Sequence, residues 1–368
     1  MKICNICNEL FYDNIKYMKI LVTGGCGFIG SNYINNQIIH KDNIIMNIDK
    51  LTYAGNLKNL HKIHKSNNYH FIKGDICDKD TVFETINNFE PDSIVHFAAE
   101  SHVDRSIDGP MQFINTNIVG TAVLLEASLA YLKNKKNPFR FLHVSTDEVY
   151  GSLGKNDFFT ESTPYSPSSP YSASKASSDH LVRAWYKTFD FPALITNCSN
   201  NYGPFQFPEK LIPLIIANCV DEKPLPIYGT GKNIRDWLYV IDHCNAIDLV
   251  LEKGELGQTY NIGGNNEVAN IDIVTSICNI MDNINPRKNK KSYKDLIKYV
   301  EDRPGHDFRY AIDASKINNE LNWRPKETFI SGIKKTVEWY LTNQDWWKNI
   351  QTANYEQERL GLLNKKNS

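Results

Sequence analysis

The sequence has no excess of charge of either sign. Its 368 residues contain 41 lysines and arginines against 42 aspartates and glutamates, which gives a formal net charge of −1. This balance excludes the broad positive field that nucleic-acid-binding proteins carry. The chain also lacks an apolar run near the roughly 18 residues that a membrane-spanning helix needs. Residues 1–8 have no apolar core of the kind found in secretory signals. We therefore predict a cytoplasmic protein with no nucleic-acid partner and no membrane partner.

The eight cysteines show no complete metal-ligand pattern. Cys4 and Cys7 form one C-x-x-C pair, but no second pair and no suitably spaced histidines follow it. We predict no metal site, although a metal held by this pair stays open as an alternative. Scattered cysteines of this kind are typical of small buried residues in a reducing compartment. These are Cys26, Cys77, Cys198, Cys219, Cys244 and Cys278.

The first half of the chain alternates short β-branched runs with longer helical stretches. The predicted strands are residues 19–23, 44–49, 70–74, 93–99, 139–146 and 193–197, and the clearest predicted helices are 116–132 and 172–189. Their consecutive apolar residues indicate strands that are covered on both faces. The alternation therefore predicts an α/β fold with a doubly wound, parallel, Rossmann-type sheet.

From about residue 200 the alternation loosens and prolines become frequent. This change predicts a smaller α+β C-terminal domain that binds substrate. The expected division is a leader at 1–17, a large domain at 18–199 to which 235–265 return, a smaller domain at 200–234 and 266–350, and a polar tail at 351–368.

A glycine-rich segment between the first predicted strand and a helix indicates a dinucleotide site. Gly24, Gly27 and Gly30 allow a sharp turn, close approach of a pyrophosphate, and packing of the helix on the sheet. Asp49 ends the second predicted strand about 20 residues further on, where an acidic residue binds the adenosine ribose and repels a 2′-phosphate. NAD is therefore favoured over NADP. The adjacent cation Lys50 weakens this preference slightly. The third strand precedes two candidates for contact with adenine, Asp75 and Ile76; for Asp75 the alternative is a simple strand-end cap.

Tyr171 and Lys175 lie four residues apart and so share one face of a predicted helix. A nearby ammonium lowers the pKa of a phenol from about 10 toward neutrality, which makes the phenol a usable general base. By itself this spacing is equally typical of a surface pair. About 140 residues after a glycine-rich turn, it indicates a catalytic pair.

Six segments carry a resemblance to a known family: residues 98–106, 144–151, 197–204, 208–213, 235–239 and 303–306. With the glycine turn and the Tyr171/Lys175 pair, they resemble the extended short-chain dehydrogenase/reductases that act on nucleotide sugars. The closest likeness, over about 19–350, is to the dTDP-glucose 4,6-dehydratases, with UDP-glucose 4,6-dehydratases as near relatives. Thr146-Asp147-Glu148 distinguishes them, since epimerases of this fold lack the acidic pair.

The resemblance implies a lyase of deoxysugar biosynthesis, such as rhamnose biosynthesis. Tyr171 takes the C4 hydroxyl proton of glucose while NAD accepts the C4 hydride. Glu148 then removes the C5 proton, Asp147 protonates the departing C6 hydroxyl, and Thr146 binds the C4 oxygen. Physically, Asp147 must stay protonated while Glu148 is ionised. The chain must also leave strand geometry near Thr146, because successive strand residues face opposite sides.

The same resemblance implies the remaining contacts and a homodimer formed through the helices at 116–132 and 171–189. The NAD-binding residues it adds are Phe28, Ile29, Lys50, Leu51, Thr52, Ala98, Ala99, Ser101, Asn117 and Asn201. The expected substrate-binding residues are His102, Thr146, Asn200, Lys210, Leu211, Ile212, Pro213, Leu214, Ile215, Pro226, Ile227, Tyr228, Arg235, Asn270, Asp302, Arg303 and His306. For Asn117, a polar residue on the first turn of a helix is the alternative, and Lys210, Tyr228 and His306 each have an ordinary structural alternative.

Two other functions stay open at this point. A 4-epimerase or a decarboxylase would share the fold, the glycines and the Tyr171/Lys175 pair, but would have no use for both acids. A non-catalytic NAD-binding protein would be expected to lack one of these side chains, and all are present. The sequence does not separate dTDP-glucose from UDP-glucose, because the two bases differ by one methyl group, worth about 1 kcal/mol of burial.

Overall fold

The computed structural model describes residues 17–135, 137–154, 156–302 and 307–354. Three features of the sequence analysis therefore lie outside the described residues. These are the Cys4/Cys7 pair with nearly all of the predicted leader, the substrate candidates Arg303 and His306, and most of the polar tail.

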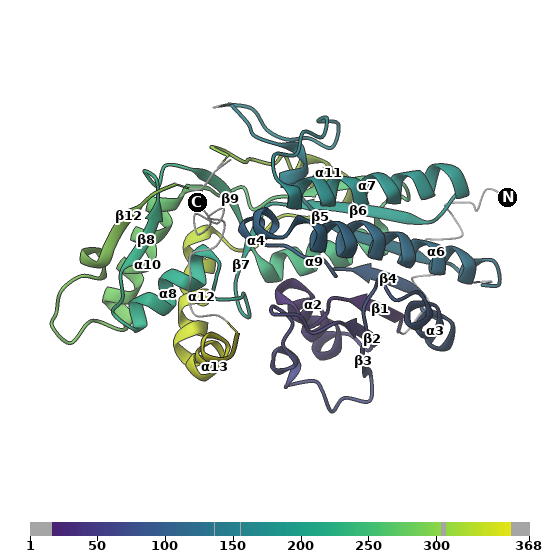
Figure 1. Ribbon diagram of the computed structural model, residues 1–368, viewed down its shortest axis with the longest axis horizontal. Helices are drawn as coiled ribbons and strands as arrows, with labels where there is room; N and C mark the ends of the chain where they lie inside the picture. The colour runs from purple at the N-terminus through teal and green to yellow at the C-terminus, as the bar shows by residue number, and fades with distance from the viewer. Residues whose placement is uncertain (1–16, 136, 155, 303–306, 355–368) are drawn as a thin grey trace, which may run out of the picture.

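A parallel sheet forms the centre of the larger part of the molecule (Figure 1). Within the described residues it has seven strands in the order β10-β6-β5-β4-β1-β2-β3. The bounds are β1 (Lys19–Thr23), β2 (Ile44–Asp49), β3 (Tyr69–Lys73), β4 (Ser93–His96), β5 (Arg140–Thr146), β6 (Ala193–Cys198) and β10 (Thr259–Ile262). The predicted doubly wound α/β fold is confirmed. Strand order reverses between β1 and β4, and in such sheets the crevice at the carboxyl ends there is the usual ligand site.

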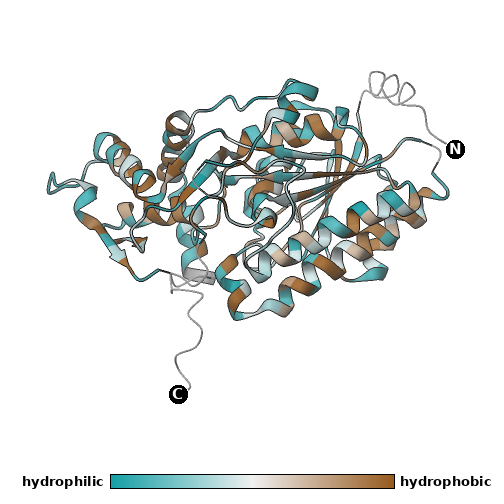
Figure 2. Ribbon diagram, turned by 90° about the horizontal axis from the view of Figure 1, so that it is seen from above, coloured by the Kyte–Doolittle hydropathy of each residue, from teal (hydrophilic) through white to brown (hydrophobic). Residues whose placement is uncertain are grey.

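Helices cover both faces of this sheet (Figure 1). On one side pack α2 (Phe28–His40), α9 (Val240–Lys253) and α11 (Ser315–Leu321), and on the other α3 (Lys79–Phe89), α6 (Thr121–Leu132) and α7 (Pro170–Phe189). Figure 2 shows hydrophobic residues concentrated on the central strands and on the helix faces toward them. Every residue of β4, β5 and β6 is buried, as expected for strands covered on both faces.

The helix before α6 begins earlier than predicted and changes its winding. It runs from α5 (Pro110–Phe113) through a π-helical segment, η2 (Ile114–Gly120), into α6. By length and composition alone, residues 110–132 could cross a membrane, with a mean hydropathy of 1.3. In the fold these residues pack against α3 and α7, so the buried part of their apolar surface serves contacts between helices.

The smaller part of the molecule has its own hydrophobic core (Figure 1, left). One sheet contains β7 (Asn200–Tyr202), β9 (Ile234–Tyr239) and β11 (Glu267–Ala269), and a second pairs β8 (Leu225–Tyr228) with β12 (Ile297–Val300). Around them pack α8 (Leu211–Val220), α10 (Asn270–Ile284), α12 (Phe329–Thr342) and α13 (Gln344–Asn354). Short helices complete the fold: η1 (Leu57–Leu60), α4 (Val103–Asp108), η3 (Asp147–Tyr150) and η4 (Tyr293–Leu296).

The chain passes between the two parts more than once. From residues 235–265, α9 and β10 join the large sheet, while β9 pairs with β7 and β11. From 266–350, α11 packs on α9 and β10, and the other helices pack in the smaller part. Where the domain boundaries fall stays a prediction, and the seam between the two parts is formed by β7 and the residues that follow it.

Candidate functional site

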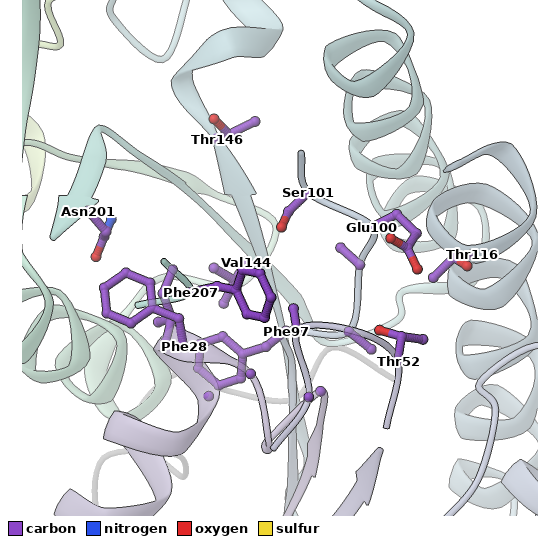
Figure 3. A pocket seen from close by; sticks show the side chains of 18 of the residues that line it. Phe28, Thr52, Phe97, Glu100, Ser101, Thr116, Val144, Thr146, Asn201 and Phe207 are labelled. Carbon is purple, nitrogen blue, oxygen red and sulfur yellow. The ribbon is translucent and has the colours of Figure 1, made fainter. Parts of the chain in front are cut away.

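A cavity of about 300 Å³ opens at the carboxyl ends of β1, β4, β5 and β6. Figure 3 shows its two kinds of wall. Apolar side chains gather on one side, among them Phe28, Phe97 and Val144, while Thr52, Glu100 and Thr116 lie on the other. The cavity coincides with the reversal in strand order, so the fold and the local chemistry point to the same place.

The glycine turn after β1 forms the floor of this cavity. Gly24 has φ +71°, and a Cβ built there would lie 2.6 Å from Ala98 Cα. A Cβ on Gly30 would lie 2.5 Å from Gly24 O. Only glycine therefore allows the turn to close onto β4 and α2 to begin beside it. The backbone at the start of α2 is left accessible to the phosphates of a dinucleotide, as the spacing predicted.

The close approach of Ala98 to Gly24 also explains why β4 is shorter than predicted. The predicted strand ran over 93–99, and the structure ends it at His96. Phe97, Ala98 and Ala99 leave the sheet and line the cavity instead. An apolar run alone does not mark this point, because these residues are as apolar as the strand itself.

Acidic side chains stand at the ends of β2 and β3. Asp49 accepts hydrogen bonds from Cys26 N at 2.8 Å and Leu51 N at 2.7 Å, and it lines the cavity. Burial raises the pKa of Asp49, and these two N–H groups partly offset the increase. Lys50 forms a 2.7 Å ion pair with Asp75, so its charge is directed toward the end of β3. The arrangement fits a ribose at Asp49 and a base near Asp75.

The acidic pair sits where the predicted departure from strand geometry occurs. β5 ends at Thr146, and Asp147–Tyr150 form a 3₁₀ turn. The Thr146 hydroxyl accepts a hydrogen bond from Glu148 N at 3.3 Å and lies 3.4 Å from Asp147 Oδ1. Because a turn replaces the alternation of a strand, both carboxyl groups line one cavity together with Thr146.

Asp147 has the environment of a protonated acid. It is 1% exposed, and burial raises its pKa well above the ordinary value, with the charges of Glu148 and Asp236 adding to the increase. Among the described residues, Asp147 Oδ2 has no hydrogen-bond partner. A buried, neutral carboxyl with an unused oxygen is suited to donate a proton to a ligand in the cavity.

Tyr171 and Lys175 share the cavity-facing side of α7, but their electrostatics differ from the prediction. Burial and the charge of Glu148 raise the pKa of Tyr171 well above 10, and a hydrogen bond from Thr146 offsets this only in part. The Lys175 ammonium donates to Val144 O at 2.9 Å, and burial lowers its pKa to about 8. The predicted lowering of the phenol pKa by Lys175 is therefore wrong for the chain alone, in which the phenol stays protonated at neutral pH.

One wall of the cavity joins three distant segments that the sequence analysis did not bring together. The Arg105 guanidinium lies 3.2 Å from Glu209 Oε2 and 3.8 Å from the centre of the Tyr53 ring. Tyr53 in turn packs edge-on against Phe207 at 5.4 Å, and His102 Nε2 lies 3.8 Å from Glu209 Oε1. This contact ties the loop after β2 and helix α4 to the segment before α8.

Most of the predicted site residues line this single cavity. They are Gly24, Gly27, Phe28, Ile29, Gly30, Asp49, Lys50, Thr52, Asp75, Ile76, Ala98, Ala99, Ser101, Thr146, Asp147, Glu148, Tyr171, Lys175, Asn200, Asn201 and Lys210. Further lining residues that the sequence analysis missed include Tyr53, Phe97, Thr116, Cys198, Phe207 and Glu209. Most of these are aromatic or small residues, which carry little signal in a sequence.

Asn117 and Leu51 were predicted to bind NAD and lie behind the cavity wall. Asn117 is buried, where it accepts from Glu100 N at 2.8 Å and donates to Glu100 O and Ser174 Oγ. Its neighbour Thr116 lines the cavity instead. Leu51 adopts φ +57° and packs against the large core. In these positions both residues shape the wall, and direct contact with a cofactor stays a prediction.

Apart from His102, the remaining described substrate candidates lie in the smaller part, outside the lining of the cavity. Arg235 on β9 donates to the backbone oxygens of Ile234 and Asp307, and its guanidinium lies 4.3 Å from the Tyr310 ring centre. Its charge lowers the pKa of Asp147, so it stands within electrostatic reach of the acids. Asn200 on β7 lines the cavity and pairs with Trp237 of β9.

Other members of the same predicted set are placed by the local fold. His102 begins α4, Ile212 and Ile215 are in the smaller core, and Asn270 begins α10. Leu211, Pro213 and Leu214 lie on α8, and Pro226, Ile227 and Tyr228 lie on β8. Asp302 follows β12, close to Gly229. Whether these residues contact a substrate stays a prediction.

Comparison with known proteins places this site in a family. The family model described as GDP-mannose 4,6 dehydratase matches residues 21–336. The dTDP-glucose 4,6-dehydratase of Salmonella typhimurium is 56% identical over 352 residues, covering 92% of this chain and 97% of that protein. The chain belongs to the dTDP-glucose 4,6-dehydratases.

Solved structures agree with this assignment. The dTDP-glucose 4,6-dehydratase of Bacillus anthracis, solved in complex with NAD, has 48% identity and a TM-score of 0.82, covering 90% of this chain and 99% of that one. The enzyme of the same name from Streptomyces venezuelae, solved with NAD bound, has 42% identity and a TM-score of 0.84, covering 90% and 100%. A UDP-glucose 4-epimerase from Thermotoga maritima, at 27% identity and a TM-score of 0.80, covers 89% and 100% and shares the fold. The family predicted from the sequence is confirmed.

Proposed function

We propose that this chain is an NAD-dependent nucleotide-sugar 4,6-dehydratase that converts dTDP-glucose to the 4-keto-6-deoxy sugar. The observation that carries this proposal is the turn after β5, which brings Asp147 and Glu148 into one cavity with Tyr171. A 4-epimerase needs a base at C4 alone, so it has no use for a second and third ionisable group. Elimination of water across C5 and C6 needs both an acid and a base.

The environment of each residue determines its proposed role in catalysis. Tyr171 accepts the C4 hydroxyl proton, and Thr146, hydrogen-bonded beside it, orients the same oxygen. Once C4 is a ketone, the C5 proton is acidic because its carbanion is stabilised by the carbonyl. Glu148 removes this proton, and Asp147 gives its own proton to the C6 hydroxyl, which leaves as water. The raised pKa of Asp147 keeps that proton in place at neutral pH.

The cavity fits NAD by its own features. The glycine turn admits a pyrophosphate where any Cβ would collide with Ala98, and Asp49 presents a carboxylate at the ribose position. Bound NAD+ supplies a hydride acceptor for C4, the hydride donor for C6 and a positive charge on its nicotinamide ring. The Tyr171 phenol is protonated in the chain alone, so a positive charge nearby is what its deprotonation requires.

The names of the relatives support dTDP-glucose as the substrate, and the cysteines support a cytoplasmic location. The curated relatives that are 54–56% identical carry the name dTDP-glucose 4,6-dehydratase, which favours dTDP-glucose over UDP-glucose. The described cysteines are all unpaired, consistent with work in the cytoplasm. We propose NAD and the nucleotide sugar as the two molecules that bind in the cavity.

A homodimer through α6 and α7 completes the proposal. These helices pack side by side, and large hydrophobic residues on and next to them are exposed: Met111, Val119 and Phe189 are 61%, 45% and 49% exposed. These exposed apolar side chains are available to an association surface. Val119→Glu should convert the dimer to a monomer in light scattering, whereas Ile330→Glu, at an exposed position on α12, should not.

The proposed reaction is tested by giving the purified protein dTDP-glucose and UDP-glucose in parallel and following the products by mass spectrometry. Loss of one water, faster with dTDP-glucose, is the expected result, and Tyr171→Phe should abolish it. An unchanged mass with inverted C4 would establish an epimerase instead. No change in either sugar would leave a non-catalytic NAD-binding protein.

A further inference from the structure

Behind Lys175 lies a buried polar cluster that the proposed steps do not use. Lys175 Nζ lies 3.5 Å from His143 Nε2. His143 Nε2 in turn lies 3.2 Å from Asp179 Oδ1. His143 and Asp179 have no exposed surface, and Lys175 is 4% exposed. Asp179 follows Lys175 by four residues on α7, so both project from the same face of that helix.

His143 Nε2 lies among polar groups from three side chains. It is 3.1 Å from Ser178 Oγ, whose hydroxyl donates to Lys175 O at 2.8 Å. The same imidazole nitrogen faces the Asp179 carboxylate and the Lys175 ammonium. Burial lowers the pKa of His143 to about 4, so the imidazole is neutral and lies next to both charged groups.

Asp179 itself is held as an anion. Its second oxygen accepts from Ser145 Oγ at 2.9 Å and from Tyr165 OH at 2.8 Å. Burial alone would raise the pKa of Asp179, but the adjacent His143, the charge of Lys175 and the hydrogen bond from Tyr165 outweigh it, and the pKa lies below the ordinary value. A buried carboxylate with this many donors is an ion that needs a buried cation as its partner.

Lys175 is that cation. Glu148 on η3 acts on Tyr171 and Cys198, which are neighbours of Lys175. The titratable groups that interact with Lys175 itself include His96 on β4, His143 on β5, Cys198 on β6 and Asp179 on α7. Of these four, Asp179 is the one that is an anion at neutral pH. Through His143 Nε2, the two charges are less than about 7 Å apart, and at that distance each shifts the pKa of the other by roughly one to two units.

We propose that Asp179 is a positioning residue whose carboxylate, next to His143, keeps Lys175 in its charged ammonium form. The inference rests on the proposed function, in which Tyr171 must give up a proton. When the Tyr171/Lys175 pair has lost one proton, it exists either as the Tyr171 phenolate with the Lys175 ammonium or as the Tyr171 phenol with a neutral Lys175 amine. Asp179 favours the phenolate with ammonium, which is the active form. Burial alone would favour the phenol with neutral amine.

The test compares the pH dependence of kcat in four proteins: wild type, Asp179→Asn, Asp179→Glu and Tyr165→Phe. In Asp179→Asn the amine loses its proton more easily, so the acid limb of the profile should move to lower pH by about one unit while the plateau falls tenfold or more. Asp179→Glu keeps the charge and should restore the wild-type limb. Tyr165→Phe removes one hydrogen bond from the same carboxylate and should leave the limb in place. An unshifted limb in Asp179→Asn, or an equal shift in Tyr165→Phe, would overturn the inference.

A double-mutant cycle with Lys175→Met covers the case in which Asp179→Asn does not fold. Removing one member of a buried ion pair is strongly destabilising, whereas removing both is tolerated. The double variant should therefore melt at a higher temperature than Asp179→Asn alone, and its residual activity should equal that of Lys175→Met. Additive losses in melting temperature would overturn the pairing. Melting temperatures test the pairing of Asp179 with Lys175 even if neither sugar is turned over. Failure of this pairing can therefore be told apart from failure of the proposed function.

Discussion

Replacing Glu148 by glutamine separates the two halves of the proposed reaction. Glutamine keeps the size of the side chain and its place on the turn after β5, but it neither carries a charge nor accepts a proton. Glu148 is the second largest cause of the raised pKa in both Asp147 and Tyr171, after burial. Its loss therefore makes the Tyr171 phenol easier to deprotonate while removing the base that acts at C5.

The two steps should respond in opposite directions. Loss of a positioned general base slows proton transfer by about 10²- to 10⁴-fold, which corresponds to about 3–5 kcal/mol of barrier. Oxidation at C4 should be unchanged or faster, because its base becomes easier to ionise. The expected consequence is an enzyme that oxidises the sugar and then stops, with its cofactor held in the reduced form.

The assay is a single turnover with excess enzyme, followed by NADH absorbance and by the mass of the sugar. Glu148→Gln should accumulate NADH and yield little dehydrated product, whereas Tyr171→Phe should form no NADH. Glu338→Gln, an exposed glutamate on α12, controls for loss of a charge elsewhere and should behave as wild type. Equal slowing of NADH formation and of water loss in Glu148→Gln would refute the division of roles.

Three further variants follow from the same geometry. Gly24→Ala places a Cβ 2.6 Å from Ala98 Cα at φ +71°, so the purified protein should lose most of its bound NAD and unfold with about 1–3 kcal/mol less free energy, as measured by cofactor content and denaturant titration. Asp49→Ala removes the carboxylate that repels a 2′-phosphate and should raise the ratio of NADP to NAD affinity at least tenfold, measured by calorimetry; an unchanged ratio would contradict its ribose role. Asp147→Asn cannot give up a proton and should slow water loss more than NADH formation. In the wild type the raised pKa of Asp147 should keep its proton in place through neutral pH, so that water loss declines in alkaline buffer; an alkaline decline that persists unchanged in Asp147→Asn would contradict the acid role.

The fold was predictable because its signals are local. Strands buried on both faces show as apolar runs, and the glycines at 24, 27 and 30 mark a turn whose first and last positions leave no room for a Cβ. The departure from strand geometry after Thr146 was also predictable, because two adjacent acids cannot share one face of a strand. Chemistry required a turn there, and a 3₁₀ turn is present.

Other features depend on contacts between distant segments, which a sequence does not display. The π-helical winding of residues 114–120 places Thr116 at the cavity and Asn117 behind its wall, and helical periodicity alone does not locate such a segment. The raised pKa of Tyr171 has a similar origin. Its burial and the charge of Glu148 come from tertiary packing, whereas the spacing to Lys175 is all that the sequence shows.

The central claim is that the hydride removed from C4 returns to C6 of the same sugar, after Asp147 and Glu148 have expelled water from the ketone. dTDP-glucose deuterated at C4, converted in a mixture with unlabelled substrate, tests this most directly. The account predicts that the deuterium appears at C6 of the product from the same molecule, with no label in the product from unlabelled sugar. Loss of the label to solvent, or its appearance in products of unlabelled sugar, would contradict it.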